Sequence, residues 1–104
     1  MNAVKDDVIQ LVAKELASAN EKFPLFHSQH EAYGEMLEEV RECEDEMKII
    51  IDDLDAIWFQ IRRNIDTKMY VGYLKEHAIN LVCEAIQVVA MCDKWGMSFE
   101  EGDQ

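Results

Sequence analysis

Five closely spaced glutamates are the side chains of this sequence best suited to do chemistry. The five are Glu35, Glu38, Glu39, Glu42 and Glu46. All but Glu38 follow one another at steps of four, three and four, which places them on one face of a helix with Glu38 close by. Like charges at these spacings repel one another, and the only lysine or arginine from residue 29 to residue 45 is Arg41. A divalent metal ion is therefore a better candidate than a neighbouring basic side chain to offset this charge.

A second group of polar side chains occurs in the last third of the chain. His77, Asn80, Glu84 and Gln87 recur at helical spacing beside an apolar stripe, so Glu84 can face the earlier glutamates across the interior of a bundle. Carboxylates on facing helices commonly build metal sites, and an all-oxygen ligand set prefers Mg²⁺ or Mn²⁺ to zinc. Because Mg²⁺ keeps several waters and recruits phosphate, such a pocket is expected to attract a nucleoside triphosphate.

The elements that must position these residues are long helices, and the first is predicted from about residue 3 to residue 21. Its apolar residues recur at steps of three and four and form one stripe. They are Val4, Val8, Leu11, Val12, Leu16 and Ala19. Pro24 ends the pattern in a short apolar connector, because proline lacks a backbone N–H and disfavours the helical conformation in the residue before it.

The second predicted helix is the longest and begins with a capping box. Ser28 is followed three residues later by Glu31, a pair whose side chains can satisfy free N–H groups of a first helical turn. Apolar residues then recur at alternating steps of three and four, the pattern of helices packed along their length. They are Leu37, Val40, Cys43, Met47, Ile50, Leu54, Ile57 and Ile61. We expect one helix from about residue 29 to residue 65, with a bend near residues 52–53 as an open alternative.

A polar turn over residues 64–68 leads into the third predicted helix. Its apolar stripe comprises Tyr70, Leu74, Ala78, Leu81, Ala85, Val88, Cys92 and Trp95. Gly96 is expected to end this helix, and the charged tail 100–104 is expected to fray. Helices of this length cannot bury broad stripes within one slim hairpin. We therefore expect an all-α antiparallel bundle, a single domain over residues 1–104, completed by oligomerisation as a homodimer or a dimer of dimers.

The composition argues against several classes of function. Acidic residues outnumber basic ones by 22 to 10, and the formal charge of −12 disfavours direct binding to nucleic acid or anionic lipid. Cys43, Cys83 and Cys92 are odd in number and lack C-x-x-C spacing, so we expect reduced core thiols rather than disulfides or a zinc site. No apolar run approaches the roughly 20 residues of a membrane span. We expect a soluble, unexported, cytoplasmic protein.

Three short motifs add a family resemblance. They read Phe26-His27-Ser28, Leu37-Glu38-Glu39-Val40-Arg41-Glu42 and Glu84-Ala85-Ile86-Gln87-Val88-Val89-Ala90-Met91. The first begins 13 residues before the second glutamate of the E-E-x-x-E motif. From about Lys22 to Trp95 the chain resembles the MazG-related all-α nucleotide pyrophosphohydrolases, particularly their short phage-type members.

The resemblance implies a MazG-like fold and hydrolysis of a nucleoside triphosphate to the monophosphate and pyrophosphate. It further implies Mg²⁺, with Mn²⁺ as an alternative, held by acidic residues of two helices. The metal ligands that it implies are Glu39, Glu42, Glu84 and Gln87. It also implies that Glu38 orients the attacking water or binds a further metal ion, and that His27 lies near the bound base.

The sequence departs from the family pattern at two points. The second motif usually reads E-x-x-D, whereas Gln87 offers a neutral amide oxygen, a weaker Mg²⁺ ligand than a carboxylate. The interval between Glu42 and Glu84 is longer than usual, which fits an extended helical hairpin. Glu76 and Asp53 are alternative fourth ligands.

A function of a different class is also compatible with the sequence. The alternative is a non-catalytic helical oligomer that acts as a protein-interaction module, or that binds nucleotide or metal without turnover. In that case Glu38, Glu39 and Glu42 form a solvated helix face, and His27 serves only local hydrogen bonds at a helix entry.

Overall fold

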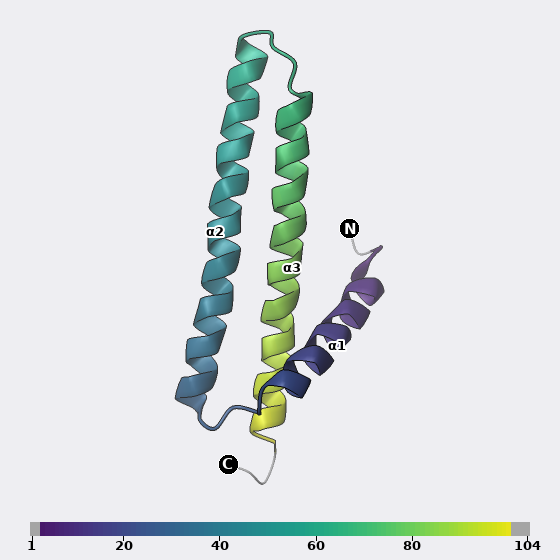
Figure 1. The fold of residues 1–104 in the computed structure, drawn as a ribbon, viewed down its shortest axis with the longest axis vertical. Coiled ribbons are helices and arrows are strands. Elements are labelled where there is room, and N and C mark those ends of the chain that lie inside the picture. Colours follow the sequence, from purple (N-terminus) through teal and green to yellow (C-terminus); the bar gives the residue numbers. More distant parts are fainter. Residues whose placement is uncertain (1–2, 101–104) are drawn as a thin grey trace.

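The computed structural model describes residues 3–100, and every helix or strand in that part of the chain is an α-helix. The helices are α1 (Lys5–Lys22), α2 (Gln29–Arg62) and α3 (Lys68–Ser98). Helices α2 and α3 form a long antiparallel hairpin, and α1 leans against the part of α3 nearest the C-terminus (Figure 1). Both α1 and α2 pack against α3, but among the described residues they do not pack against each other. The all-α prediction is confirmed.

The hairpin makes the molecule elongated, 63 Å along its longest axis and 28 and 24 Å across. Within residues 3–100, none of the helices combines the length and the apolar character that a membrane crossing requires. Most of the tail for which fraying is expected, residues 101–104, lies outside the described part of the chain. Because α2 and α3 are long and a short turn joins them, a site between these two helices lies on an extended helical support.

Helix α2 is continuous over 34 residues and passes residues 52–53 without a sharp kink (Figure 1). It ends at Arg62 rather than near residue 65. Asn64 adopts the left-handed conformation, with φ at 56°, which asparagine tolerates better than most residues. The Ile65 N–H then donates to Gln60 O at 3.0 Å, so the last turn is closed before α3 begins.

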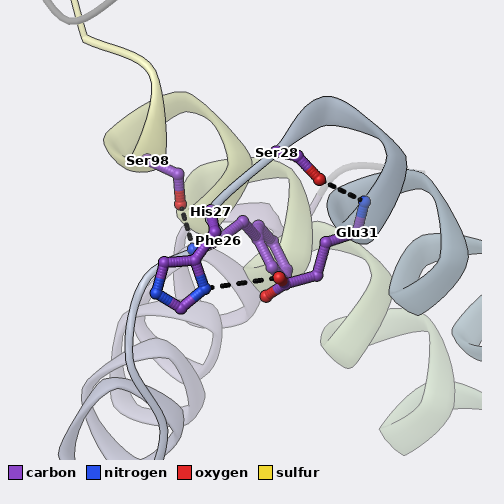
Figure 2. A network of polar contacts seen from close by, with 5 residues as sticks. All are labelled: Phe26, His27, Ser28, Glu31 and Ser98. Carbon is purple, nitrogen blue, oxygen red and sulfur yellow. Dashed lines mark hydrogen bonds and ion pairs between the residues drawn. The ribbon is translucent and has the colours of Figure 1, made fainter.

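The start of α2 is fixed by a side-chain cap. Phe23 is extended, with φ at −133° and ψ at 145°, as the residue before Pro24 should be. The Glu31 N–H donates to Ser28 Oγ at 3.0 Å (Figure 2), which confirms the N-cap half of the predicted capping box. In place of the reciprocal half, the Glu31 carboxylate lies 3.4 Å from His27 Nδ1.

Helix α3 continues through Gly96 to Ser98, so the prediction that Gly96 ends it is wrong. Ser98 Oγ donates to Lys94 O at 2.7 Å and accepts from the Phe26 N–H at 2.9 Å (Figure 2). Trp95 Nε1 donates to Gln29 Oε1 at 2.5 Å. These contacts tie the last turn of α3 to the connector and to α2, and they outweigh the preference of glycine for ending a helix.

The face of α2 that packs against α3 is half polar, unlike the apolar seam expected from periodicity. Its buried or half-buried residues at steps of three and four are Ala32, Met36, Glu39, Cys43, Glu46, Ile50, Asp53, Ile57 and Gln60, and Leu37 and Ala56 beside them are also half-buried. The predicted seam residues Val40, Met47, Leu54 and Ile61 are instead 46%, 45%, 57% and 49% exposed. That prediction is therefore wrong for half of its positions, because polar residues one position earlier face α3.

Polar pairs cross from α2 to α3 at intervals of seven residues. Gln60 Nε2 donates to Tyr70 Oη at 3.3 Å, and Asp53 Oδ2 lies 2.5 Å from His77 Nδ1. In an antiparallel hairpin, seven residues back along α2 correspond to seven residues forward along α3. The same register therefore places Glu84 opposite the glutamates of α2.

The hydrophobic core of a single chain is small. Its buried apolar residues are Val12, Phe26, Ala32, Ile57 and Ala90. None of the large side chains among residues 3–100 is fully buried. Cys83 and Cys92 are exposed, Cys43 is half-buried, and all three are free thiols. The expectation of core thiols is therefore wrong for two of the three cysteines.

Removal of the Ser28 cap is expected to weaken the start of α2. Ser28→Ala leaves the Glu31 N–H without its acceptor and should lower the free energy of unfolding by about 1 kcal/mol, measured by urea denaturation followed by circular dichroism. Ser28→Asp keeps an acceptor oxygen and is the control. Equal stability of Ser28→Ala and the wild type would contradict a structural role for this cap.

Candidate metal centre and adjoining cavity

Three of the glutamates singled out in the sequence meet between α2 and α3. Glu39, Glu42 and Glu84 each offer one carboxylate oxygen, and these three oxygens lie within 4.8 Å of one another. Glu39 and Glu84 are half-buried and Glu42 is exposed, so the cluster lies at the edge of the helix contact and opens to solvent. The structure thus brings together the two segments that the facing-helix interpretation requires.

The helical register fixes this arrangement. Glu39 and Glu42 are three residues apart, so they lie on adjacent turns of one face of α2. On α3, Glu84 follows His77 by seven residues, and the contact of His77 with Asp53 sets how the two helices are aligned. The polar contact farther along the hairpin therefore keeps the carboxylates opposite one another despite their repulsion.

The cluster and the neighbouring Glu46 contain buried carboxylate oxygens without partners. Among the described residues, the Oε2 atoms of Glu39, Glu46 and Glu84 are buried and have no hydrogen-bond partner. An unpaired charged oxygen is costly to bury. The ion pairs of the described residues are His27–Glu31, Lys48–Glu44 and His77–Asp53. No described basic side chain therefore pairs with the cluster, and a cation from solution can fill that role.

Repulsion and burial raise the pKa values of this group. The pKa of Glu84 is raised to about 7, first by a hydrogen bond shared with Glu42, then by burial and by the negative charges of Glu42, Glu39 and Glu46. Burial, followed by the charges of neighbouring glutamates, raises the pKa of Glu39. Burial and the charge of Glu84 raise the pKa of the Cys43 thiol. Without a cation, a proton between Glu84 and Glu42 relieves part of the repulsion near neutral pH.

The donor set fits a hard divalent cation. The three clustered side chains offer oxygen atoms only, which suits Mg²⁺ or Mn²⁺ better than zinc. The buried Oε2 atoms of Glu39 and Glu84 are acceptors that a cation can satisfy. Glu42, on the solvent side, leaves the open edge at which a cation can keep water molecules.

The other candidate residues lie around the cluster and outside it. Glu38 is exposed and precedes Glu39, but it does not belong to the group of converging oxygens. Gln87, one turn after Glu84, is half-buried and lines an adjoining cavity. The His27 side chain is 76% exposed, lies beside Glu31 (Figure 2) and does not line that cavity.

The alternative fourth ligands are not in the cluster. Asp53 lies beside His77, about two helical turns from Glu46, and Glu76 is exposed. Glu46 is the additional carboxylate that matters here, because its charge acts on Glu84 and its Oε2 atom is buried without a partner in the described chain.

A cavity of about 360 Å³ opens beside the cluster, where α1, the connector and the two long helices meet. Glu39 belongs both to the cluster and to the wall of this cavity. Phe23 and Phe26 of the connector supply aromatic surface, and Lys22 and Lys94 supply the cations of the lining. A small molecule in this cavity can therefore reach the carboxylate cluster at Glu39.

Lys94 is a residue that the sequence reasoning missed. It is only 5% exposed, and its Nζ lies 4.7 Å from the centroid of the Phe26 ring and 6.0 Å from that of Phe23. The aromatic faces hold the ammonium group at the wall of a cavity whose other charged side chains are four glutamates and Lys22. A signal was present in the sequence, because Lys94 follows Gln87 by seven residues and is the only lysine or arginine from residue 76 to residue 104.

No family model, curated protein or solved structure matches this chain. Membership of the MazG-related group therefore stays a prediction that rests on the three sequence motifs. To these motifs the structure adds the convergence of Glu39, Glu42 and Glu84 and the neighbouring cavity.

The raised pKa of Glu84 predicts that the metal-free protein loses stability as the pH rises. The usual pKa of 4.5 applies to the unfolded chain and a pKa of about 7 to the folded protein, so the folded state binds this proton more tightly. The stabilisation that this bound proton gives the folded state is complete below pH 4.5 and is lost as the pH rises through about 7.

Glu84→Gln removes this titration because an amide does not ionise. With a chelator present, the variant should be more stable than the wild type by roughly 1 to 2 kcal/mol near pH 8 and about equal near pH 5. Thermal unfolding at the two pH values measures the difference. Glu44→Gln, an exposed change on α2 outside the cluster, is the control. The same difference at both pH values would contradict the assignment to Glu84.

Proposed function

We propose that this protein is a MazG-like, Mg²⁺-dependent nucleoside triphosphate pyrophosphohydrolase, with Mn²⁺ as an alternative cation. The observation that carries the proposal is the convergence of oxygens from Glu39, Glu42 and Glu84 within 4.8 Å, on two facing helices. The unpartnered buried Oε2 atoms of Glu39 and Glu84 support it, as does the resemblance of the motifs that contain these residues.

The reaction converts a nucleoside triphosphate and water to the monophosphate and pyrophosphate. A bound Mg²⁺ supplies charge neutralisation of the phosphates and a lowered pKa of water. The oxygen of water bonds to the α-phosphorus, the bond from that phosphorus to the α–β bridging oxygen breaks, and pyrophosphate leaves with the electron pair. Glu38 is the proposed residue that orients the water, and the neighbouring carboxylates take up its proton.

The cavity beside Glu39 is the proposed position of the nucleotide. Its volume of about 360 Å³ lies in the range of small-molecule sites. Phe23 and Phe26 offer apolar surface to the base or sugar, and the buried ammonium of Lys94 offers positive charge to a phosphate. His27, which follows Phe26, is the proposed neighbour of the base at the rim.

The proposal includes the setting in which the site works. We place the protein in the cytoplasm as a homodimer or a dimer of dimers, without direct contact to nucleic acid or membrane. The formal charge of −12 repels phosphates wherever no cation intervenes. The many exposed apolar side chains of the hairpin support self-association.

Loss of a clustered carboxylate is expected to abolish activity. Glu39→Gln and Glu42→Gln should each lower Mg²⁺-dependent pyrophosphate release by at least about 100-fold, because an amide is a weaker ligand than a carboxylate. The assay uses a panel of natural and modified nucleoside triphosphates. Glu44→Gln, at an exposed position whose carboxylate lies 4.0 Å from Lys48, is the matched control and should retain activity.

The outcome of the same assay separates the competing functions. No pyrophosphate from any nucleotide of the panel would exclude the hydrolase. The presence of Gln87 in place of a carboxylate favours the non-catalytic alternative. If no pyrophosphate is released, thermal unfolding separates the remaining functions. A melting temperature raised by Mg²⁺ or Mn²⁺ and nucleotide indicates a binding module. An unchanged melting temperature indicates a helical interaction module.

Lys94 is expected to contribute to substrate binding. Lys94→Met keeps the length of the side chain but removes its charge, so KM should rise about tenfold with a smaller change in kcat. Lys94→Arg keeps the charge and should restore most of the affinity. Steady-state kinetics measure both variants, and thermal unfolding checks that they are folded. An unchanged KM for Lys94→Met would remove Lys94 from the proposed site.

A further inference from the structure

Glu46 places a carboxylate in the contact between α2 and α3 without a counter-charge from the described chain. The residue is half-buried, and its Oε2 atom is buried with no hydrogen-bond partner among the described residues. None of the ion pairs within residues 3–100 includes it. Because an unpaired carboxylate oxygen is costly to bury, we expect a group from outside the described chain to satisfy this atom.

The helical register places Glu46 level with Glu84. Asp53 on α2 contacts His77 on α3. Seven residues back along α2 from Asp53 lie at Glu46, and seven residues forward along α3 from His77 lie at Glu84. The Oε2 atom of Glu84 is likewise buried without a partner in the described chain. Two carboxylates with unsatisfied oxygens therefore meet in one layer of the helix contact.

Glu46 borders the carboxylate cluster without entering it. The pKa of Glu84 is raised first by the hydrogen bond with Glu42 and then by burial and neighbouring charges, one of which is that of Glu46. The oxygens that converge within 4.8 Å nevertheless come from Glu39, Glu42 and Glu84. A carboxylate next to such a group can reach a cation through a water molecule, and Mg²⁺ keeps several of its waters when a protein binds it.

The polar residue on the other side of the cluster supplies no negative charge. Gln87 follows Glu84 by about one turn of α3, is half-buried and carries a neutral amide. It lines the cavity next to Glu39. Glu46 follows Glu42 by about one turn of α2 and lies on the side away from this cavity. With Glu46, four carboxylates instead of three attract a divalent cation to the cluster.

We propose that Glu46 is the fourth carboxylate of the cation site and that it binds the ion through one of the ion's water molecules. It supplies from α2 the negative charge that Gln87 lacks on α3. Glu46 is a positioning residue, because its carboxylate orients a water molecule on the cation and does not touch the reacting atoms. The inference rests on the cation of the proposed function, and it requires neither nucleotide nor hydrolysis.

The first test measures cation binding by the full chain without nucleotide. Electron paramagnetic resonance of free Mn²⁺ gives the affinity. Glu46→Gln should weaken Mn²⁺ binding at least about tenfold, because the amide lacks the charge. Glu44→Gln, an exposed change 4.0 Å from Lys48, is the matched control and should bind as the wild type does. The double variant Glu46→Gln/Gln87→Asp returns a carboxylate to the neighbourhood of Glu84 and should recover most of the affinity.

Thermal unfolding separates a role in cation binding from a merely structural one. In the presence of a chelator, Glu46→Gln should melt no lower than the wild type, because the change removes a repelling charge from the helix contact. When Mg²⁺ is added, the melting temperature of the variant should rise less than that of the wild type. Lower stability with the chelator, combined with an unchanged gain from Mg²⁺, would assign Glu46 to packing and overturn the proposal.

The outcomes distinguish this inference from the proposed function. Equal Mn²⁺ affinity of Glu46→Gln and the wild type, or no recovery in the double variant, overturns the role of Glu46 and leaves the hydrolase standing. A wild type that binds no Mn²⁺ overturns both. Weakened binding by Glu46→Gln, in a protein that releases no pyrophosphate, supports the role of Glu46 and excludes only the hydrolase.

Discussion

The contact between α2 and α3 places polar side chains opposite one another, and the rest of the structure depends on how these are aligned. Gln60 with Tyr70 and Asp53 with His77 are favourable pairs, whereas the carboxylates around Glu84 repel one another. Apolar side chains tolerate a shift along a helix seam more easily than hydrogen-bonded pairs do. The favourable pairs therefore fix a register that the repelling carboxylates alone would not favour, and they hold these carboxylates close together.

Periodicity predicted the fold well because it detects helices irrespective of what covers them. It predicted the three helices, the connector at Pro24 and the cap at Ser28, all of which depend on local preferences. Periodicity assigned the wrong face of α2 to the contact with α3, because α2 carries two stripes that are offset by one residue. Leu54 and Ile61 belong to the exposed stripe, while Asp53 and Gln60 take the positions against α3. The polar partners on α3 determine which stripe of α2 packs against it, and a local sequence pattern does not reveal these partners.

The candidate site was predictable where it depends on spacing along a helix. Glu39, Glu42 and Glu84 could be singled out because steps of three residues and a facing stripe are visible in the sequence. The burial of Lys94 could not be predicted in this way, because it depends on the connector, which places Phe23 and Phe26 against α3. The end of α3 was misjudged for a related reason. Ser98 bonds to the connector, and this tertiary contact outweighs the local tendency of Gly96 to end a helix.

The absence of packing between α1 and α2 in the described chain has a consequence for the order of folding. Each of these helices packs only against α3, the last helix in the sequence. The contacts that close the cavity end of the molecule join Phe26 to Ser98 and Gln29 to Trp95. During synthesis, α1 and α2 therefore have no described partner until α3 has left the ribosome. Helix α3 therefore brings the other two helices together when the three fold.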